Sequence, residues 1–218
     1  ALFCLSILLS NIGTWMQQVA QPWIILSLSH SSFLVGLDSF ALNAPSWVFT
    51  LWGGVIADRM NRKNVILLFQ STQFLCIIVL LVLLVTGQLH VWMIIVVSFL
   101  VGTTDSLSMP SFQSIIPSRV NQKDIPRAVA LNSTQFNLSR MLGPAIAGVV
   151  MARFGAITCF SANAFSYIPF FISLFWIYPK SGFEIKKDSF QQQPTHLREY
   201  KTLLKSPDVR TPLITIFV

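Results

Sequence analysis

The residues best suited to chemistry in this sequence are polar side chains set within long apolar segments. One group lies in the segment 1–28 and consists of Asn11, Thr14, Gln18 and Gln21. Steps of three and four residues place such side chains near one face of a helix. Because lipid cannot satisfy amides and hydroxyls, this face must meet either a neighbouring helix or a wet cavity that holds a substrate. The sequence leaves both interpretations open.

Charged side chains also lie inside apolar segments. Asp105 and Arg140 are each about 20 Å from the nearest basic link, at about 1.5 Å per helical residue. An unpaired charge at that depth is costly, so we expect the two to interact, in a structural role or in the handling of protons or substrate. Asp38 lies about one turn into its segment. There we expect a solvated carboxylate at the membrane surface, with a proton or cation site as the alternative.

The elements that position these residues follow from composition. The 218 residues are 53% hydrophobic and only 11% charged, whereas soluble domains are about 25% charged. Six apolar segments reach the roughly 20 residues that a membrane span needs. They are residues 1–28, 34–56, 64–86, 91–117, 127–151 and 154–178. Spans of this length must be helices, because lipid leaves no other way to satisfy the backbone. We therefore predict an all-α membrane protein with a six-helix transmembrane bundle.

Every second link between these segments is basic. The basic links contain Arg59, Arg62 and Lys63, then Arg119, Lys123 and Arg127, and then a cluster of lysines and arginines after residue 179. The opposite links contain His30, His90 and Arg153. This alternation predicts that the N-terminus and the basic links are cytoplasmic. The net charge of +7 thus reflects membrane topology, and no nucleic-acid partner is expected.

The chain after the sixth segment differs in composition. Residues 180–206 are polar, and 196–205 have the apolar spacing of a short amphipathic helix, so we expect a cytoplasmic linker. A seventh span is expected to start within 207–218. The expected domains are therefore a bundle at 1–179, the linker, and this start of a second half. Because the chain begins with Ala1 and stops inside an apolar run, we expect it to be part of a longer protein.

The link between the second and third segments carries a recognisable pattern. It contains Gly54, Asp58, Arg59, Arg62 and Lys63, with Asn61 where glycine is usual. The link resembles the signature loop of the major facilitator superfamily, roughly G-x-x-x-D-R-x-G-R-K. Asp58 and Arg62 lie one helical turn apart and can pair. Such a pair can latch two helices in one conformation and release them in another. The alternative is an ordinary basic loop.

A second pattern lies in the fifth segment. Gly143, Pro144 and Gly148 are similar to the G-P-x-x-x-G signature of the proton-coupled exporters of this superfamily. The glycines would let a neighbouring helix approach closely, and the proline would kink the helix. The fourth segment departs from the resemblance, because Ser98 stands where many of these exporters carry an arginine. The stretches 109–110, 137–148 and 197–210 resemble a bacterial subgroup of siderophore, macrolide and drug exporters.

This resemblance implies the N-terminal half of a transporter that works by alternating access. It would export a small organic molecule in exchange for protons, as a multi-pass monomer in the bacterial inner membrane. No enzyme motif and no metal-binding spacing is present in the sequence, so no catalysis, metal or cofactor is expected. Two alternatives remain: the membrane domain of an ATP-driven exporter, and a non-transporting membrane scaffold.

Overall fold

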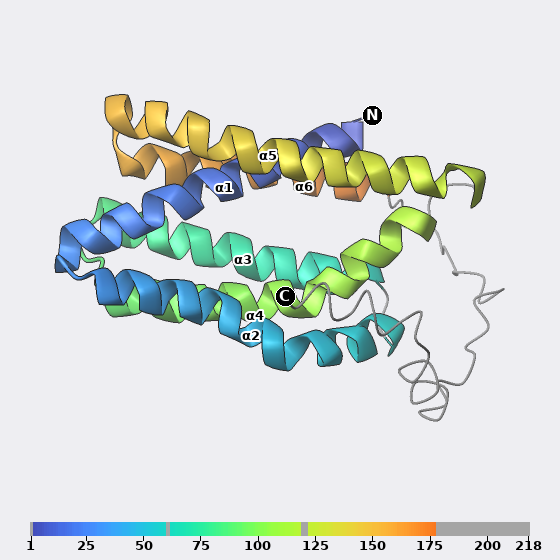
Figure 1. Ribbon diagram of the computed structural model, residues 1–218, viewed down its shortest axis with the longest axis horizontal. Coiled ribbons are helices and arrows are strands. Elements are labelled where there is room, and N and C mark those ends of the chain that lie inside the picture. Colours follow the sequence, from blue (N-terminus) through green and yellow to red (C-terminus); the bar gives the residue numbers. More distant parts are fainter. Residues whose placement is uncertain (1, 60–61, 119–121, 178–218) are drawn as a thin grey trace, which may run out of the picture. The chain divides into compact units, whose positions relative to one another are not determined.

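The computed structural model describes residues 2–59, 62–118 and 122–177, which fold into helices and contain no strand (Figure 1). The elements are α1 (Leu2–Ser29), α2 (Ser32–Arg59), α3 (Arg62–Val85), α4 (Val91–Ser118), η1 (Gln122–Asp124), α5 (Ile125–Phe154) and α6 (Ala156–Ile177). The prediction of an all-helical protein is confirmed for these residues. Each predicted apolar segment corresponds to one α-helix. The expected linker at 180–206 and seventh span at 207–218 lie outside the described residues.

Tight turns end the helices at one end of the bundle. His30 has φ 52° between α1 and α2, and Gly155 has φ 80° between α5 and α6. The Gly155 N–H donates to the carbonyl oxygen of Met151 at 3.0 Å, which caps α5. Left-handed backbone conformations of this kind stop a helix and reverse the chain. These turns and the one between α3 and α4 therefore hold consecutive helices antiparallel.

Two helices organise the bundle. α1 packs against α5 and α6, and α4 packs against α2 and α3. Contacts of α3 with α6, and of α1 with α2, join the two groups. Glycines permit the closest approaches. A Cβ on Gly102 of α4 would collide with the backbone carbonyl of Leu42 in α2, and a Cβ on Gly13 of α1 would lie 2.9 Å from the Cα of Asn163 in α6. Small residues at such crossings bring helix backbones together.

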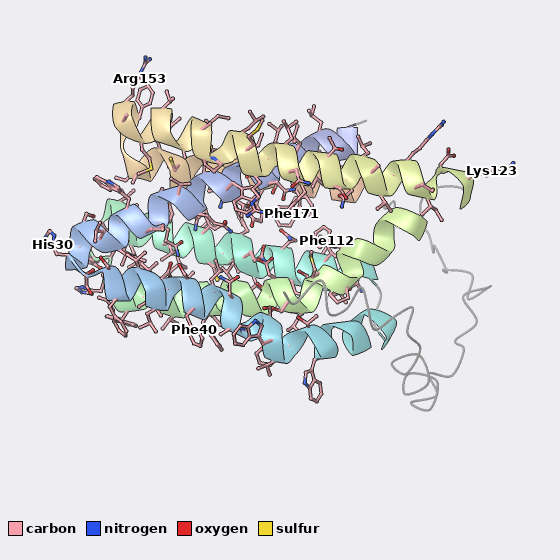
Figure 2. The ribbon with its side chains drawn as sticks, in the orientation of Figure 1. His30, Phe40, Phe112, Lys123, Arg153 and Phe171 are labelled. Carbon is pink, nitrogen blue, oxygen red and sulfur yellow. The ribbon has the colours of Figure 1, made fainter. Side chains whose placement is uncertain are left out.

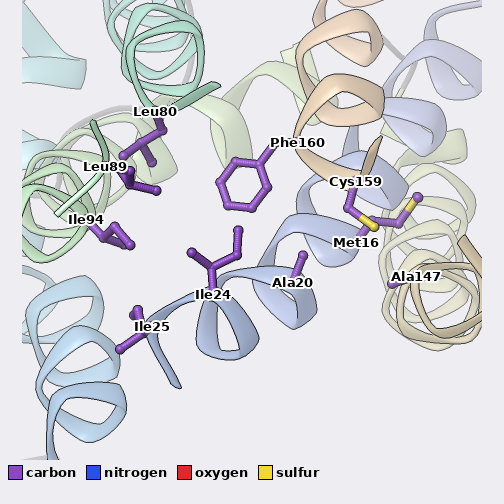
Figure 3. Close-up of a cluster of buried hydrophobic side chains, with 10 residues drawn as sticks. All are labelled: Met16, Ala20, Ile24, Ile25, Leu80, Leu89, Ile94, Ala147, Cys159 and Phe160. Atoms are coloured by element: carbon purple, nitrogen blue, oxygen red, sulfur yellow. The ribbon is translucent and has the colours of Figure 1, made fainter. Parts of the chain in front are cut away.

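An apolar core fills the end of the bundle near these turns (Figure 3). Its buried side chains are Met16, Ala20, Ile24, Ile25, Leu80, Leu89, Ile94, Ala147, Cys159 and Phe160. A second, aromatic cluster includes Phe112 and Phe170, whose ring centroids are 6.2 Å apart. Outside these cores many large apolar side chains are exposed, among them Leu75 at 61% and Val82 at 54% in α3. Such an exterior suits lipid rather than water.

Length and composition alone identify three described helices as able to cross a membrane. They are Asn64–Val85, Val91–Phe112 and Ala156–Ser173, within α3, α4 and α6. α1 and α2 are 28 residues long and α5 is 30, so they are long enough to span, but they are more polar. Part of that polarity is buried at contacts between helices, as at Gln21 and Asp38, and part is exposed, as at Gln18 and Asn137. The number of membrane-crossing helices therefore stays a prediction.

Candidate functional site

A buried carboxylate joins three helices. The Asp38 side chain on α2 is only 4% exposed. Its Oδ2 accepts from Nε2 of Gln21 on α1 at 2.8 Å, and its Oδ1 accepts from Oγ of Ser98 on α4 at 2.5 Å. Gln21 Nε2 also donates to Ser98 Oγ at 2.8 Å. Both hydrogen-bond donors to this carboxylate are neutral, and within the described ranges no cationic side chain forms an ion pair with it.

The expectation of a solvated Asp38 at the membrane surface is wrong. α2 and α4 run side by side, and the Gly102–Leu42 contact draws their backbones together one turn beyond Ser98 and Asp38. Asp38 is covered between these helices, and its carboxylate is directed at Gln21 and Ser98. One partner of Asp38 is thus Ser98, the position at which the sequence departs from the resemblance described above.

The Asp38 cluster extends across α1 to α6. Gln17 Nε2 donates to Gln21 Oε1 at 3.4 Å, and Gln17 Oε1 accepts from Asn163 Nδ2 at 2.6 Å. Asn163 is 2% exposed. Side-chain amides carry both a donor and an acceptor, so they can transmit a hydrogen-bond chain without a net charge. A continuous polar chain therefore runs from α6 through α1 to the Asp38 carboxylate.

A second polar cluster is centred on Gln73 of α3. Its Nε2 donates to Asp105 Oδ1 at 2.6 Å and to Thr104 Oγ1 at 3.2 Å, both on α4. Its Oε1 accepts from the Tyr167 hydroxyl of α6 at 3.3 Å. These hydrogen bonds link α3, α4 and α6 near the middle of their length.

The predicted contact between Asp105 and Arg140 is not formed in this structure. Among the residues that the structure describes, no ion pair joins them, and each has a different neighbour. Asp105 turns toward Gln73, whereas the Arg140 guanidinium carbon lies 5.6 Å from the ring centroid of Trp15 on α1. Similar depth on consecutive helices did not bring the two charges to the same side of α4 and α5.

Residues 1–190 match the model of a family described as transmembrane secretion effector. The chain belongs to this family, within the major facilitator superfamily. Relatives include the staphyloferrin A transporter of Staphylococcus aureus, 30% identical over 157 residues, which is 72% of this chain and 40% of the relative. The enterobactin exporter EntS of Shigella boydii is 28% identical over 147 residues, or 67% of this chain and 35% of EntS.

An uncharacterized transporter of the same superfamily, YfiS of Bacillus subtilis, is 27% identical over 217 residues. That alignment covers 96% of this chain and 50% of YfiS. The chain thus spans half or less of the length of the curated relatives that it matches. Family membership confirms the resemblance that the sequence predicted, and it places the buried polar clusters within a transporter fold.

The predicted polar row on α1 divides between its two interpretations. Gln21 is buried and bonds to α2 and α4, while Thr14 is half-buried and donates to the Ser10 carbonyl oxygen at 3.1 Å. Asn11 is half-buried and Gln18 is exposed, so these two remain candidates for contact with a substrate. One part of the row therefore bonds to neighbouring helices, and another part leaves polar side chains accessible.

The roles of Gln73, Asn163 and Tyr167 were not predicted from the sequence. Two of them could have been recognised, because Gln73 and Asn163 are side-chain amides within otherwise apolar spans. A polar group buried without a partner costs free energy, so a lone amide at membrane depth predicts a partner on another helix. The identity of that partner depends on how the helices pack, which one sequence does not show.

The signature-loop residues lie at a helix junction. The backbone places Asp58 and Arg59 in the last turn of α2, and Arg62 and Lys63 in the first turn of α3. Their side chains lie outside the described residues, so the latch stays a prediction. Gly54 lies in α2, and a Cβ there would meet no neighbour within 4 Å.

The two glycines of the α5 pattern have different surroundings. A Cβ on Gly143 would collide with the Trp15 side chain and lie 3.2 Å from the Ile12 carbonyl oxygen of α1, so the expected close approach is found there. A Cβ on Gly148 would meet nothing within 4 Å, so the close approach expected at Gly148 is absent. Pro144 lies inside α5, which continues without interruption from Ile125 to Phe154.

Proposed function

We propose that this chain forms the N-terminal six-helix half of an exporter that works by alternating access. The exporter would move a small siderophore-like or drug-like molecule out of a bacterial cell in exchange for protons. Membership of the transmembrane secretion effector family supports the transport role. The names of the staphyloferrin A and enterobactin relatives support the class of cargo. The match over residues 1–190 also argues against the membrane domain of an ATP-driven exporter.

The observation that carries proton coupling is the buried Asp38 carboxylate with neutral partners. A carboxylate at membrane depth costs several kcal/mol unless it is paired or solvated. Two neutral hydrogen bonds offset part of this cost, and a proton removes the charge altogether. Asp38 is therefore our candidate for the carboxylate that couples transport to protons.

The position of this cluster suits a coupled motion. Asp38 lies about 9 Å inside the start of α2, at about 1.5 Å per residue, and Ser98 lies at a similar depth in α4. The three hydrogen-bonding side chains come from three different helices. Any movement of α1 or α2 against α4 would break at least one of these hydrogen bonds. Such a movement would change the surroundings of the Asp38 carboxylate between conformations of the bundle.

The membrane orientation is part of the same proposal. Lys123 lies at the end of the bundle opposite to His30 and Arg153 (Figure 2). We assign the Lys123 end, the N-terminus and the linker 180–206 to the cytoplasm, by the positive-inside rule. The protein would work as a monomer in the inner membrane.

The test uses the protein expressed from its complete gene and reconstituted into lipid vesicles. A pH gradient should drive uptake of at least one member of a panel of siderophores and drugs. The variant Asp38→Asn should lose the gradient-driven accumulation while keeping exchange of substrate down its own gradient. Asp124→Asn removes an exposed carboxylate in η1 and should behave as wild type. No movement of any compound by the wild type would overturn the transport role, and full proton coupling in Asp38→Asn would overturn the assignment of Asp38.

A further inference from the structure

Arg140 lies at mid-depth in α5 and forms no ion pair with any side chain that the structure describes. It lies about 22 Å from the start of α5 and a similar distance from its end, at about 1.5 Å per residue. The side chain is exposed, and the described side chains offer it no ion pair. Its guanidinium carbon lies 5.6 Å from the ring centroid of Trp15. A charge at this depth faces a wet cavity or meets a partner rather than lipid.

The surface of α5 shows which of these surroundings Arg140 has. The buried row that faces α1 consists of Gln135, Ser139, Gly143 and Ala147. The exposed side chains on one side of this row are mostly apolar: Leu131, Leu138, Met141 and Val149, with Thr134 among them. The other side carries a polar strip of Ser133, Asn137 and Arg140, with the exposed Val129 and Phe136 between it and the row. Because a charge at mid-depth is costly against lipid, the side that carries Arg140 faces away from lipid, beside α1.

α1 continues this polar strip. Asn11, Trp15 and Gln18 are spaced at four and three residues and share one face of α1. Trp15 is half-buried, and the Phe136 ring of α5 meets it edge-on with centroids 5.9 Å apart. Gly143 admits the Trp15 side chain against α5. Trp15 is therefore held between the two helices, and the Arg140 guanidinium lies over its ring.

We propose that Arg140, supported by Trp15, is the subsite that binds a carboxylate group of the exported molecule. The subsite rests on the proposed function, because it names the class of cargo that the exporter takes. A guanidinium on an indole ring is held in place by the cation–π attraction, and its N–H groups stay free at the edges. Those N–H groups match a carboxylate in a bidentate arrangement. The amide of Gln18 and that of Asn11 lie on the same edge and suit the uncharged polar groups of such a cargo.

The subsite is tested by equilibrium binding to the full-length protein in lipid nanodiscs. The probes are citrate, which carries three carboxylates, and its trimethyl ester, which has the same skeleton without the charges. Arg140→Gln should weaken citrate binding about 10- to 100-fold, the usual range for hydrogen bonds to a charged group. It should leave the binding of the ester unchanged. Arg140→Lys keeps the charge but lacks the paired N–H donors of the guanidinium, so it should weaken citrate binding by an intermediate amount.

Matched variants keep the test decisive. Arg153→Gln removes an exposed cation at the end of α5 and should bind citrate as wild type does. Trp15→Phe keeps an aromatic ring and should weaken citrate binding less than Arg140→Gln. A wild-type protein that binds citrate no better than the ester overturns the subsite. So does an Arg140→Gln variant that loses both probes, since it would show a structural role.

A further outcome separates the subsite from an internal charge pair. If Arg140→Gln binds citrate normally but loses transport, and Asp105→Asn restores transport, Arg140 pairs with Asp105 in another conformation and the subsite falls. The proposed function stands in that case, because gradient-driven transport by the wild type is measured separately. If the wild type transports no compound of the panel, the proposed function fails first and the subsite fails with it.

Discussion

The contact between Gly102 and Leu42 allows a quantitative prediction about the Asp38 cluster. A Cβ at position 102 would lie 2.8 Å from the Leu42 carbonyl carbon, whereas ordinary contact begins at 3.4 Å. Gly102→Ala must therefore separate α2 from α4 by at least about 0.6 Å, and by more to clear the carbonyl oxygen. One turn away, the Ser98–Asp38 hydrogen bond of 2.5 Å would lengthen to the limit of hydrogen bonding or beyond it.

The energetic cost follows from overpacking and from the lost hydrogen bond. Overpacking costs about 1–3 kcal/mol, and leaving a buried acceptor without its donor adds about 1–3 kcal/mol. Gly102→Ala should therefore lower the unfolding temperature in detergent and abolish proton-coupled transport. Gly36→Ala is the matched control, because a Cβ at this position of α2 meets nothing within 4 Å and Gly36 belongs to neither sequence pattern. This control gains helix propensity, worth up to about 1 kcal/mol, and should be neutral or stabilising.

The result that would refute this reasoning is equally definite. A Gly102→Ala variant as stable and as active as Gly36→Ala would show that α2 and α4 do not touch at this point in the membrane. The position of Asp38 beside Ser98 would then also be in question. A Gly102→Ala variant that unfolds early but retains full proton coupling would separate the packing from the function, and would remove Ser98 from the coupling mechanism.

Three further predictions follow from other parts of the bundle. Gln73→Leu removes the hydrogen bonds that join α3 to α4 and α6, and should destabilise the protein by about 1–3 kcal/mol. Thermal unfolding measures this loss, and an unchanged melting temperature would show that these hydrogen bonds do not form. Asp58→Asn should slow transport without lowering stability, because the proposed latch forms in one conformation and breaks in another. A normal transport rate in vesicles would instead support the interpretation of this link as an ordinary basic loop. Ser31→Cys should react with a membrane-impermeant thiol reagent added outside intact cells, and Lys123→Cys only after the cells are opened. The reverse pattern would invert the topology.

The helices were predictable because lipid restricts them. Each apolar run had to be helical and about 20 residues long, and polar links had to end it. The boundaries observed at His30, Gly87 and Gly155 fall in the links that the sequence indicated, where a positive φ turns the chain. Local residue patterns were therefore sufficient for the elements of the fold.

The partners of the site residues were not predictable in the same way. Periodicity places Gln21 and Gln18 on one face of α1, but it does not show that α4 approaches one of them and not the other. The same limit explains the error at Asp38, whose depth was estimated along α2 alone, without the helix that covers it. Arg140 and Asp105 were paired by depth, and depth does not specify the side of a helix. A single polar residue such as Gln73 in an apolar span predicts a hydrogen-bond partner, but the sequence does not identify that partner.

Backbone-to-backbone contacts also shape how such a bundle can move. Gly102 packs directly against the Leu42 carbonyl, with no side chain between the two backbones. If α4 tilts against α2 about this contact, the ends of α4 move much farther than the contact itself. Gly102 lies about 24 Å from the end of α4 at Ser118, at about 1.5 Å per residue. A tilt of about 10° about this contact would move that end by roughly 4 Å, enough to admit water, while the atoms at the contact hardly move. A gate can thus open at one membrane face without loosening the middle of the bundle.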